Sequence, residues 1–195
     1  MKINLKNFTD EYLLTLKNLN TGQIDKFAKG IFNIKKRKGR IFFLGVGGSA
    51  ANCAHAVNDF RKLCEIESYS ATDNFSELTA RINDEGWDSS FSNWLKISNL
   101  KSNDGIFILS VGGGSLKKKV SVNIIKAIEY AKKKKATIFG VVSKDGGYTK
   151  KHADFVVHIS VSNNKLVTPI SESIQSFIWH YFVSHPKLQK NKPKW

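Results

Sequence analysis

Cysteine, proline and acidic residues are scarce in this chain of 195 residues, and each scarcity excludes a class of protein. Cys53 and Cys64 are too few for a disulfide framework, and their spacing fits no zinc module. We expect both to be small core residues. Three prolines and 11% aromatic residues exclude a collagen, a proline-rich linker and a disordered chain.

Long apolar runs are absent as well. No run approaches the roughly 20 residues of a membrane span, and the first residues lack the apolar segment of a signal peptide. We therefore expect a cytoplasmic protein. Apolar residues make up 41% of the chain, which suffices for a continuous core at this length, and the length itself fits one domain.

The shortage of acidic residues leaves the chain strongly basic. Lysine and arginine number 31 against 16 aspartates and glutamates, which gives a formal net charge of +15. This balance favours anionic partners, but it does not separate nucleic acid, a membrane surface and phosphorylated metabolites.

Short apolar segments alternate with helical patterns along most of the chain. Two amphipathic helices are expected before Lys38, and later helices at 50–64, 120–135 and 171–183. The expected strands are 40–44, 68–71, 105–110, 136–142 and 155–159. Apolar strands that alternate with helices are typical of a parallel sheet covered on both faces. We predict an α/β, doubly wound domain at 40–185, with an N-terminal helical arm at 1–39 that belongs to the same domain and a basic tail at 186–195.

Two of the expected strands end in glycine-rich segments, Gly45–Ser49 and Ser110–Ser115, each ahead of an expected helix. Ligands bind beyond the carboxyl ends of such strands, and a helix N-terminus attracts phosphate. These glycines could instead form tight turns alone, but two equivalent loops favour a binding site. The first loop fits a dinucleotide fingerprint without its later acidic residue, and neither loop carries the lysine of a triphosphate loop. A phosphorylated small molecule is therefore favoured over NAD or ATP.

The segment Gly47-Gly48-Ser49-Ala50-Ala51, followed by His55, resembles the phosphoheptose isomerases, a branch of the sugar isomerase (SIS) proteins. Further matching residues are 71–74, 78–86, 110–115, 145–147, Glu172 and His180. The resemblance covers about residues 40–185. It implies a five-stranded parallel sheet flanked by helices, assembled as homotetramers with active sites between subunits.

His55 and Asp59 lie four residues apart on an expected helix, so their side chains share one face. Such a pair can bind a divalent metal such as zinc, or it can form a surface hydrogen bond. The resemblance implies the metal role, with proton transfer by the carboxylate as well, although Asp59 replaces a glutamate that is one methylene longer. It also implies that Glu172, in place of a glutamine, and His180 belong to the metal and substrate site.

The resemblance implies a set of substrate-binding residues in and between the two glycine loops. They are Gly47, Gly48, Ser49, Asp59, Asn83, Asp84, Ser110, Val111, Gly112, Ser115 and Glu172. Taken alone, Asn83 and Asp84 would form a turn at a helix end. Val111 and Gly112 replace two hydroxyl residues of the family pattern, and Val46 replaces an asparagine, but backbone amides can still hold an anion.

The implied activity is aldose–ketose isomerisation of a phosphosugar, such as sedoheptulose 7-phosphate to D-glycero-D-manno-heptose 7-phosphate. This reaction needs a base beside the carbonyl and an acid for the enediolate oxygen. The resemblance implies Asp59 as the base, His180 as its acid partner and zinc as the organising cofactor. The alternatives are an isomerase of another phosphosugar, or a non-catalytic SIS protein that binds a protein or DNA. The retention of His55 together with Asp59 and His180 disfavours the non-catalytic alternative.

Glu172 and His180 are eight residues apart, which is ~12 Å along a straight helix. We therefore predict that different copies of the chain supply them to one site. A mixture of inactive His55→Ala and His180→Ala chains is then expected to regain activity. The aromatic residues near His180 are expected at the contact between copies, with a place in the core as the alternative: Phe177, Trp179 and Tyr181.

Overall fold

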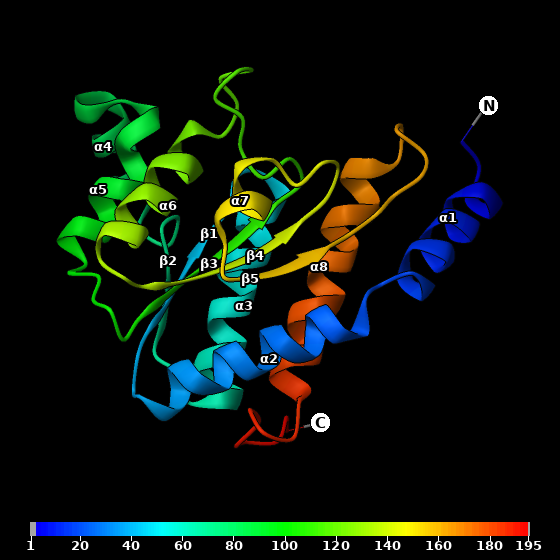
Figure 1. Cartoon of the computed structure of the whole chain (residues 1–195), viewed down its shortest axis with the longest axis horizontal. Coiled ribbons are helices and arrows are strands. Elements are labelled where there is room, and N and C mark those ends of the chain that lie inside the picture. The colour runs from blue at the N-terminus through cyan, green and yellow to red at the C-terminus, as the bar shows by residue number, and fades with distance from the viewer. Residues whose placement is uncertain (1–2, 195) are drawn as a thin grey trace.

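A five-stranded sheet with helices on both faces forms the centre of the molecule in the computed structural model, which describes residues 3–194 (Figure 1). The strands are β1 (Ile41–Leu44), β2 (Ser68–Ser70), β3 (Gly105–Ser110), β4 (Thr137–Val142) and β5 (Phe155–His158). The helices are α1 (Leu5–Lys17), α2 (Thr21–Lys36), α3 (Gly48–Cys64), α4 (Phe75–Glu85), α5 (Ser90–Ile97), α6 (Val122–Lys133), α7 (Gly147–His152) and α8 (Val167–Ser184), with one 3₁₀ turn, η1 (Trp87–Ser89).

The strands are all parallel and follow the order β2-β1-β3-β4-β5. This confirms the predicted doubly wound, five-stranded sheet. The chain leaves β1 for one face of the sheet and β3 for the other, so the crevice between the ends of these two strands is where ligands bind in such folds.

Alternating side chains divide the core into two layers. Phe43 and Phe107 face α2, α3 and α8, where the ring of Phe27 lies 5.0 Å from that of Phe107 and 4.9 Å from that of Phe182. Phe42 and the neighbouring Ile106 face the other layer, which α5 and α6 cover. Apolar side chains thus pack on both faces of the sheet, and the loops beyond its strands extend from this core.

Cys53 and Cys64 are buried in the first layer, as predicted. Burial raises the pKa of the Cys64 thiol to about 11 and raises that of Cys53 further, so both remain protonated. The tail beyond α8 also packs on this layer, because Leu188 is fully buried and the backbone N–H of Lys190 donates to the carbonyl of Leu63.

Three helices, α4, α5 and the six-residue α7, were not predicted from the sequence. No residue of α4 is buried, and α5 is only eight residues long, so neither gives a clear helical repeat of apolar residues. The start of α8 is four residues earlier than predicted and takes Pro169 into its first turn, where proline is tolerated. No helix within residues 3–194 has the length and apolar character needed to cross a membrane.

Candidate metal and substrate site

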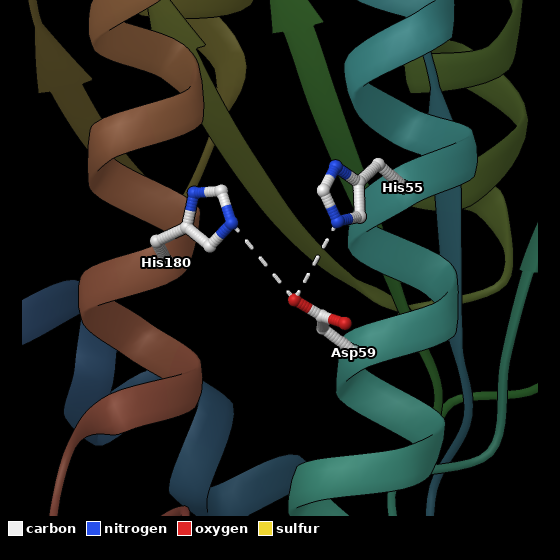
Figure 2. Close-up of side chains that lie close together, drawn as sticks. All are labelled: His55, Asp59 and His180. Atoms are coloured by element: carbon white, nitrogen blue, oxygen red, sulfur yellow. Dashed lines mark ion pairs between the residues drawn. The ribbon is translucent and has the colours of Figure 1, made fainter. Parts of the chain in front are cut away.

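Three of the predicted metal ligands converge between α3 and α8. The Oδ2 atom of Asp59 lies 3.8 Å from Nε2 of His55 and 4.0 Å from Nε2 of His180. Figure 2 shows the carboxylate reaching from α3 toward both imidazoles, with His180 entering from α8. One ligand atom from each residue lies within 4.8 Å of the others. The shorter side chain of Asp59 therefore reaches both histidines.

The hydrogen bonds around these residues fix which atoms face one another. Nδ1 of His180 donates to the carbonyl oxygen of Ser176 over 2.8 Å, because a carbonyl can only accept. The neutral ring then has a lone pair on Nε2, the atom that faces Asp59. The amide of Asn58 donates to Oδ1 of Asp59 over 2.8 Å and leaves Oδ2 toward the histidines. Electron-pair donors thus face one another across a short gap.

This arrangement fits a divalent cation. Zinc binds imidazole nitrogen and carboxylate oxygen at about 2.0–2.2 Å, so the three ligand atoms would have to approach one another slightly. The side chains of His55 and His180 are 58% and 48% exposed and have room to turn. A metal-binding histidine commonly donates its second ring N–H to a backbone carbonyl, as His180 does to Ser176. Three protein ligands also leave a position for substrate.

The Trp179 ring packs beneath both imidazoles of this group. Its ring centroid lies 4.6 Å from that of His55 and 3.5 Å from that of His180, and the side chain is fully buried. The prediction that Trp179 is exposed at a contact between copies is therefore wrong, because it belongs to the core of its own chain. Phe177 and Tyr181, on another face of α8, are 47% and 41% exposed.

The fourth predicted ligand, Glu172, lies apart from this three-residue group. A Cβ atom on Gly48 would stand 2.5 Å from Oε2 of Glu172, so the carboxylate lies directly against the first residue of α3. A helix N-terminus carries partial positive charge, which favours a carboxylate there. Glu172 thus borders the first glycine loop rather than the histidines.

The first glycine loop leads straight into α3. Gly47 and Gly48 are exposed, whereas Ser49 is buried in the first turn. Gly47 has φ of +62°, a left-handed conformation that favours glycine, and no atom lies within 4 Å of its would-be Cβ. The loop therefore presents bare backbone beside the carboxylate of Glu172.

The second glycine loop is not equivalent to the first, which corrects the prediction. Ser115 and Val120 pair as an antiparallel bridge, so a small hairpin separates the loop from α6. The Ser110 hydroxyl accepts a hydrogen bond from the N–H of Gly113, and that of Ser115 accepts one from Lys118. Several of these glycines serve close packing.

Two backbone contacts show this packing of the second loop. A Cβ on Gly113 would stand 2.0 Å from the carbonyl oxygen of Gly146. Val111 is half-buried and its carbonyl accepts from Ser143, whereas Gly112 has open space around it.

Asn83 and Asp84 lie in the last turn of α4, which agrees with the helix-end interpretation. Both are exposed, and the amide of Asn83 donates to the carboxylate of Asp84 over 2.7 Å. Leu78 packs α4 on the sheet face opposite α3 and α8. Within one chain, the fold therefore does not bring this pair to the histidines.

The convergence of His55 and His180 within one chain corrects a second prediction. Glu172 and His180 do lie at separate positions, as their distance along α8 predicts. One chain nevertheless brings His55, Asp59 and His180 together, so no second copy is needed for these three residues. Mixed His55→Ala and His180→Ala chains are therefore not expected to regain activity by exchange. Sequence reasoning also missed Ser176, four residues before His180, whose carbonyl orients the ring.

Comparison with known proteins identifies the family of this chain. A profile of the SIS domain family matches residues 7–143, beginning inside α1. The phosphoheptose isomerase of Rhodospirillum rubrum is 29% identical over 138 residues, covering 68% of this chain and 70% of the relative. That of Vibrio vulnificus is 31% identical over 144 residues, or 72% of each chain. The structure of phosphoheptose isomerase from Neisseria gonorrhoeae shares the fold, with a TM-score of 0.78 at 22% identity over 92% of this chain and 93% of that chain. The chain therefore belongs to the SIS domain family, in its phosphoheptose isomerase branch.

Proposed function

We propose that this protein is a phosphosugar aldose–ketose isomerase that converts sedoheptulose 7-phosphate into D-glycero-D-manno-heptose 7-phosphate. The observation that carries the proposal is the convergence of His55, Asp59 and His180 between α3 and α8, in a chain of this family branch. A phosphorylated substrate, which does not cross membranes unaided, also supports a cytoplasmic location.

The reaction moves one hydrogen from C1 to C2 of the sugar and one hydroxyl proton from O1 to O2. Asp59 is the base: its carboxylate, held by Asn58, takes the C1 proton to give an enediolate and returns the proton to C2. Nε2 of His180 has the lone pair needed to take the O1 proton, and the imidazolium then donates that proton to O2.

His55, Asp59 and His180 are also the residues that would hold zinc. Bound zinc would act as a Lewis acid that polarises the sugar carbonyl. Nε2 of His180 cannot hold a metal and a proton together, so it would move the O1 proton only in the metal-free site; with zinc bound it would be a ligand, and the zinc would stabilise the negative charge on the sugar oxygen instead. Glu172 lies outside the three-residue group and serves the substrate rather than the metal.

Charge determines how the substrate would lie. The Glu172 carboxylate accepts hydrogen bonds from sugar hydroxyls at the N-terminus of α3. Its negative charge repels a phosphate from the first glycine loop, Gly47 to Ser49. The phosphate therefore extends toward the second loop, where the hydroxyls of Ser110 and Ser115 can donate hydrogen bonds. These two groups hold the phosphate at the opposite end of the sugar from the reacting carbons.

The decisive experiment is an incubation with a panel of ketose and aldose phosphates, with zinc and with EDTA, followed by ¹³C NMR of the sugars. Wild type with zinc is expected to interconvert a ketose–aldose pair. Asp59→Asn is expected to be inactive, and His185→Ala, which changes a histidine outside the site, is the matched control. Failure of zinc-loaded wild type to convert any sugar in the panel would refute the proposal.

A second candidate is an isomerase of another phosphosugar. It is favoured by the carboxylate of Glu172 at the substrate loop, where the family pattern has a neutral amide. Val46 beside it is 38% exposed and offers no hydrogen bond to a sugar hydroxyl. The same panel decides between the two candidates, because each predicts turnover of a different sugar.

We also propose a homotetramer whose copies complete one another's sites. In α4, which carries Asn83 and Asp84, no residue is buried and Phe75 is 77% exposed, so the helix is available to a neighbour. Phe177 and Tyr181 border an apolar groove of about 310 Å³ between α8 and α2 that a second copy would cover. Sedimentation should show a tetramer, and Phe177→Lys should dissociate it with loss of activity. A fully active wild-type monomer would refute this arrangement.

A further inference from the structure

A basic depression lies between the loop after β3 and the loop after β4, one strand beyond the crevice between β1 and β3. Its volume is about 480 Å³. Gly112 and Ser115 form one edge, and its other lining comes from the hairpin before α6 and from α7. None of His55, Asp59, Glu172 or His180 lines it.

Three lysines from separate segments line this depression. Lys118 belongs to the hairpin, Lys144 follows β4, and Lys151 lies on α7. In the described part of the chain, no salt bridge joins any of them to a carboxylate. One carboxylate, that of Asp145, also lines the depression, and it accepts a hydrogen bond from the N–H of Gly147. Three ammonium groups against one carboxylate leave a net positive site.

The backbone around the depression is held in an unfavourable conformation. Lys144 has φ of +50°, and Lys119 and Ser121, next to lining residues, both have φ of +51°. The other non-glycine residues with positive φ lie one or two residues after a helix end: Lys38, Glu65, Asn99 and Lys135. A left-handed backbone is unfavourable for a residue with a Cβ atom, whereas glycine adopts it readily. The fold thus tolerates lysine at 144 where glycine would be easier.

A specific contact secures Lys144 in this conformation. Nε2 of His158 donates to the carbonyl oxygen of Lys144 over 2.8 Å. The backbone N–H of His158 in turn donates to the side chain of Gln23. His158, which has no place in the catalytic group, is therefore a positioning residue for this loop.

The remaining walls of the depression are apolar or aromatic. Leu116 and Val120 are 58% and 55% exposed, and the Tyr148 ring packs on His152 at 4.0 Å between centroids. The backbone N–H groups of Tyr148 and Thr149 are already bonded to the carbonyls of the second glycine loop. An anion here would accordingly bind to lysine side chains, with an attached ring against the apolar wall.

We propose that this depression is a second anion site, which binds a phosphate monoester carrying an apolar or aromatic ring. Lys118, Lys144 and Lys151 pair with the phosphate, while Leu116 and Val120 contact the ring. Ser115 borders both this depression and the position proposed for the sugar phosphate, whereas Ser110 and the residues His55, Asp59, Glu172 and His180 do not line the depression, so binding here can be tested apart from the isomerase activity.

Calorimetric titration with AMP, inorganic phosphate and adenosine tests the proposal. AMP is expected to bind more tightly than phosphate, and adenosine not to bind. In Lys144→Gln/Lys151→Gln the Kd for AMP should rise at least about fivefold, the value for losing partly screened charged hydrogen bonds. The control is Lys26→Gln/Lys96→Gln, which removes the same charge at exposed sites and should change the Kd less than twofold.

Further variants separate the alternatives. Lys151→Gln alone should also raise the Kd for AMP. Because Lys151 lies on the regular backbone of α7, this variant tests the site even if a substitution at Lys144 disturbs its loop. His55→Ala and Ser110→Ala should both bind AMP normally, because neither residue lines the depression. A loss of binding in either variant would place AMP in the catalytic crevice or at the sugar-phosphate position and refute the site. An equal rise in the Kd for AMP in the double variant and in the Lys26→Gln/Lys96→Gln control would also refute the site, because the net charge of the protein would then explain binding. Turnover of phosphosugars, measured separately, reports on the isomerase proposal alone.

Discussion

The contact between Gly48 and Glu172 gives a sharp test of the substrate loop. In the variant Gly48→Ala, the new Cβ would stand 2.5 Å from Oε2 of Glu172, whereas ordinary contact begins at 3.4 Å. The carboxylate must therefore move by about 1 Å. Because Glu172 has a flexible side chain, it can do so without distorting the backbone.

The expected effect is on catalysis rather than on stability. A displacement of about 1 Å at a substrate-positioning group can lower the rate about 100-fold. Alanine is favoured over glycine in a helix by up to about 1 kcal/mol, so the free energy of unfolding should not fall. We expect kcat/KM to drop about 100-fold while the Tm stays the same or rises.

A double-mutant cycle identifies the cause. If Gly48→Ala acts through Glu172, it should have no further effect on kcat/KM in a Glu172→Ala background. Gly22→Ala, in the first turn of α2, is the matched control and should leave kcat/KM unchanged, since its new Cβ would lie 3.3 Å from Asn20 Oδ1. Wild-type kcat/KM in Gly48→Ala, or a full loss that persists in the Glu172→Ala background, would refute the reasoning.

Three other predictions address the metal, the stability and the phosphate. Elemental analysis should find roughly one divalent metal per chain, and His180→Ala should lose it; equal metal in that variant would contradict the ligand assignment. Burial opposes the ionisation of Asp104, but hydrogen bonds from Arg40 and the backbone outweigh it and hold the pKa of Asp104 below its usual value. Its stabilisation is therefore complete above about pH 4 and is lost as the pH falls through the lower, folded-state pKa. Asp104→Asn should lower the free energy of unfolding by about 3 kcal/mol at pH 7, and urea titrations should show this gap narrowing in acid; a constant gap would contradict the linkage. Ser115→Ala should raise KM about two- to tenfold with unchanged kcat, the effect of one hydrogen bond, and an unchanged KM would remove Ser115 from the phosphate site.

The sheet could be predicted because its strands are encoded locally. β1 and β3 are short segments of mainly apolar residues ahead of glycine-rich loops, and such segments are typical of buried parallel strands. The peripheral helix α4 could not be predicted in this way, because it buries none of its residues and so lacks an apolar repeat.

The candidate site likewise has one part that local sequence predicts and one part that depends on packing between helices. Spacing along a single helix predicts that His55 and Asp59 share a face, because positions four apart are neighbours on any α-helix. The approach of His180 depends on how α8 packs against α3, and nothing in the spacing of residues more than 120 positions apart specifies it. The resemblance to a family supplied that expectation. The prediction that different copies supply the site came chiefly from the helix rise between Glu172 and His180, and it fails for the histidines because one chain brings both to Asp59.

By itself, the sequence determined the alternation of strands and helices, the two glycine loops and the pair on α3, all of which depend on neighbours along the chain. Tertiary structure alone decided that His180 faces Asp59, that Glu172 lies against Gly48, and that Ser115 begins a hairpin rather than a helix. It also gathered Lys118, Lys144 and Lys151 around one depression. Local patterns fix the direction of a side chain within its own element, whereas contacts between elements arise only when the parallel sheet places their ends side by side.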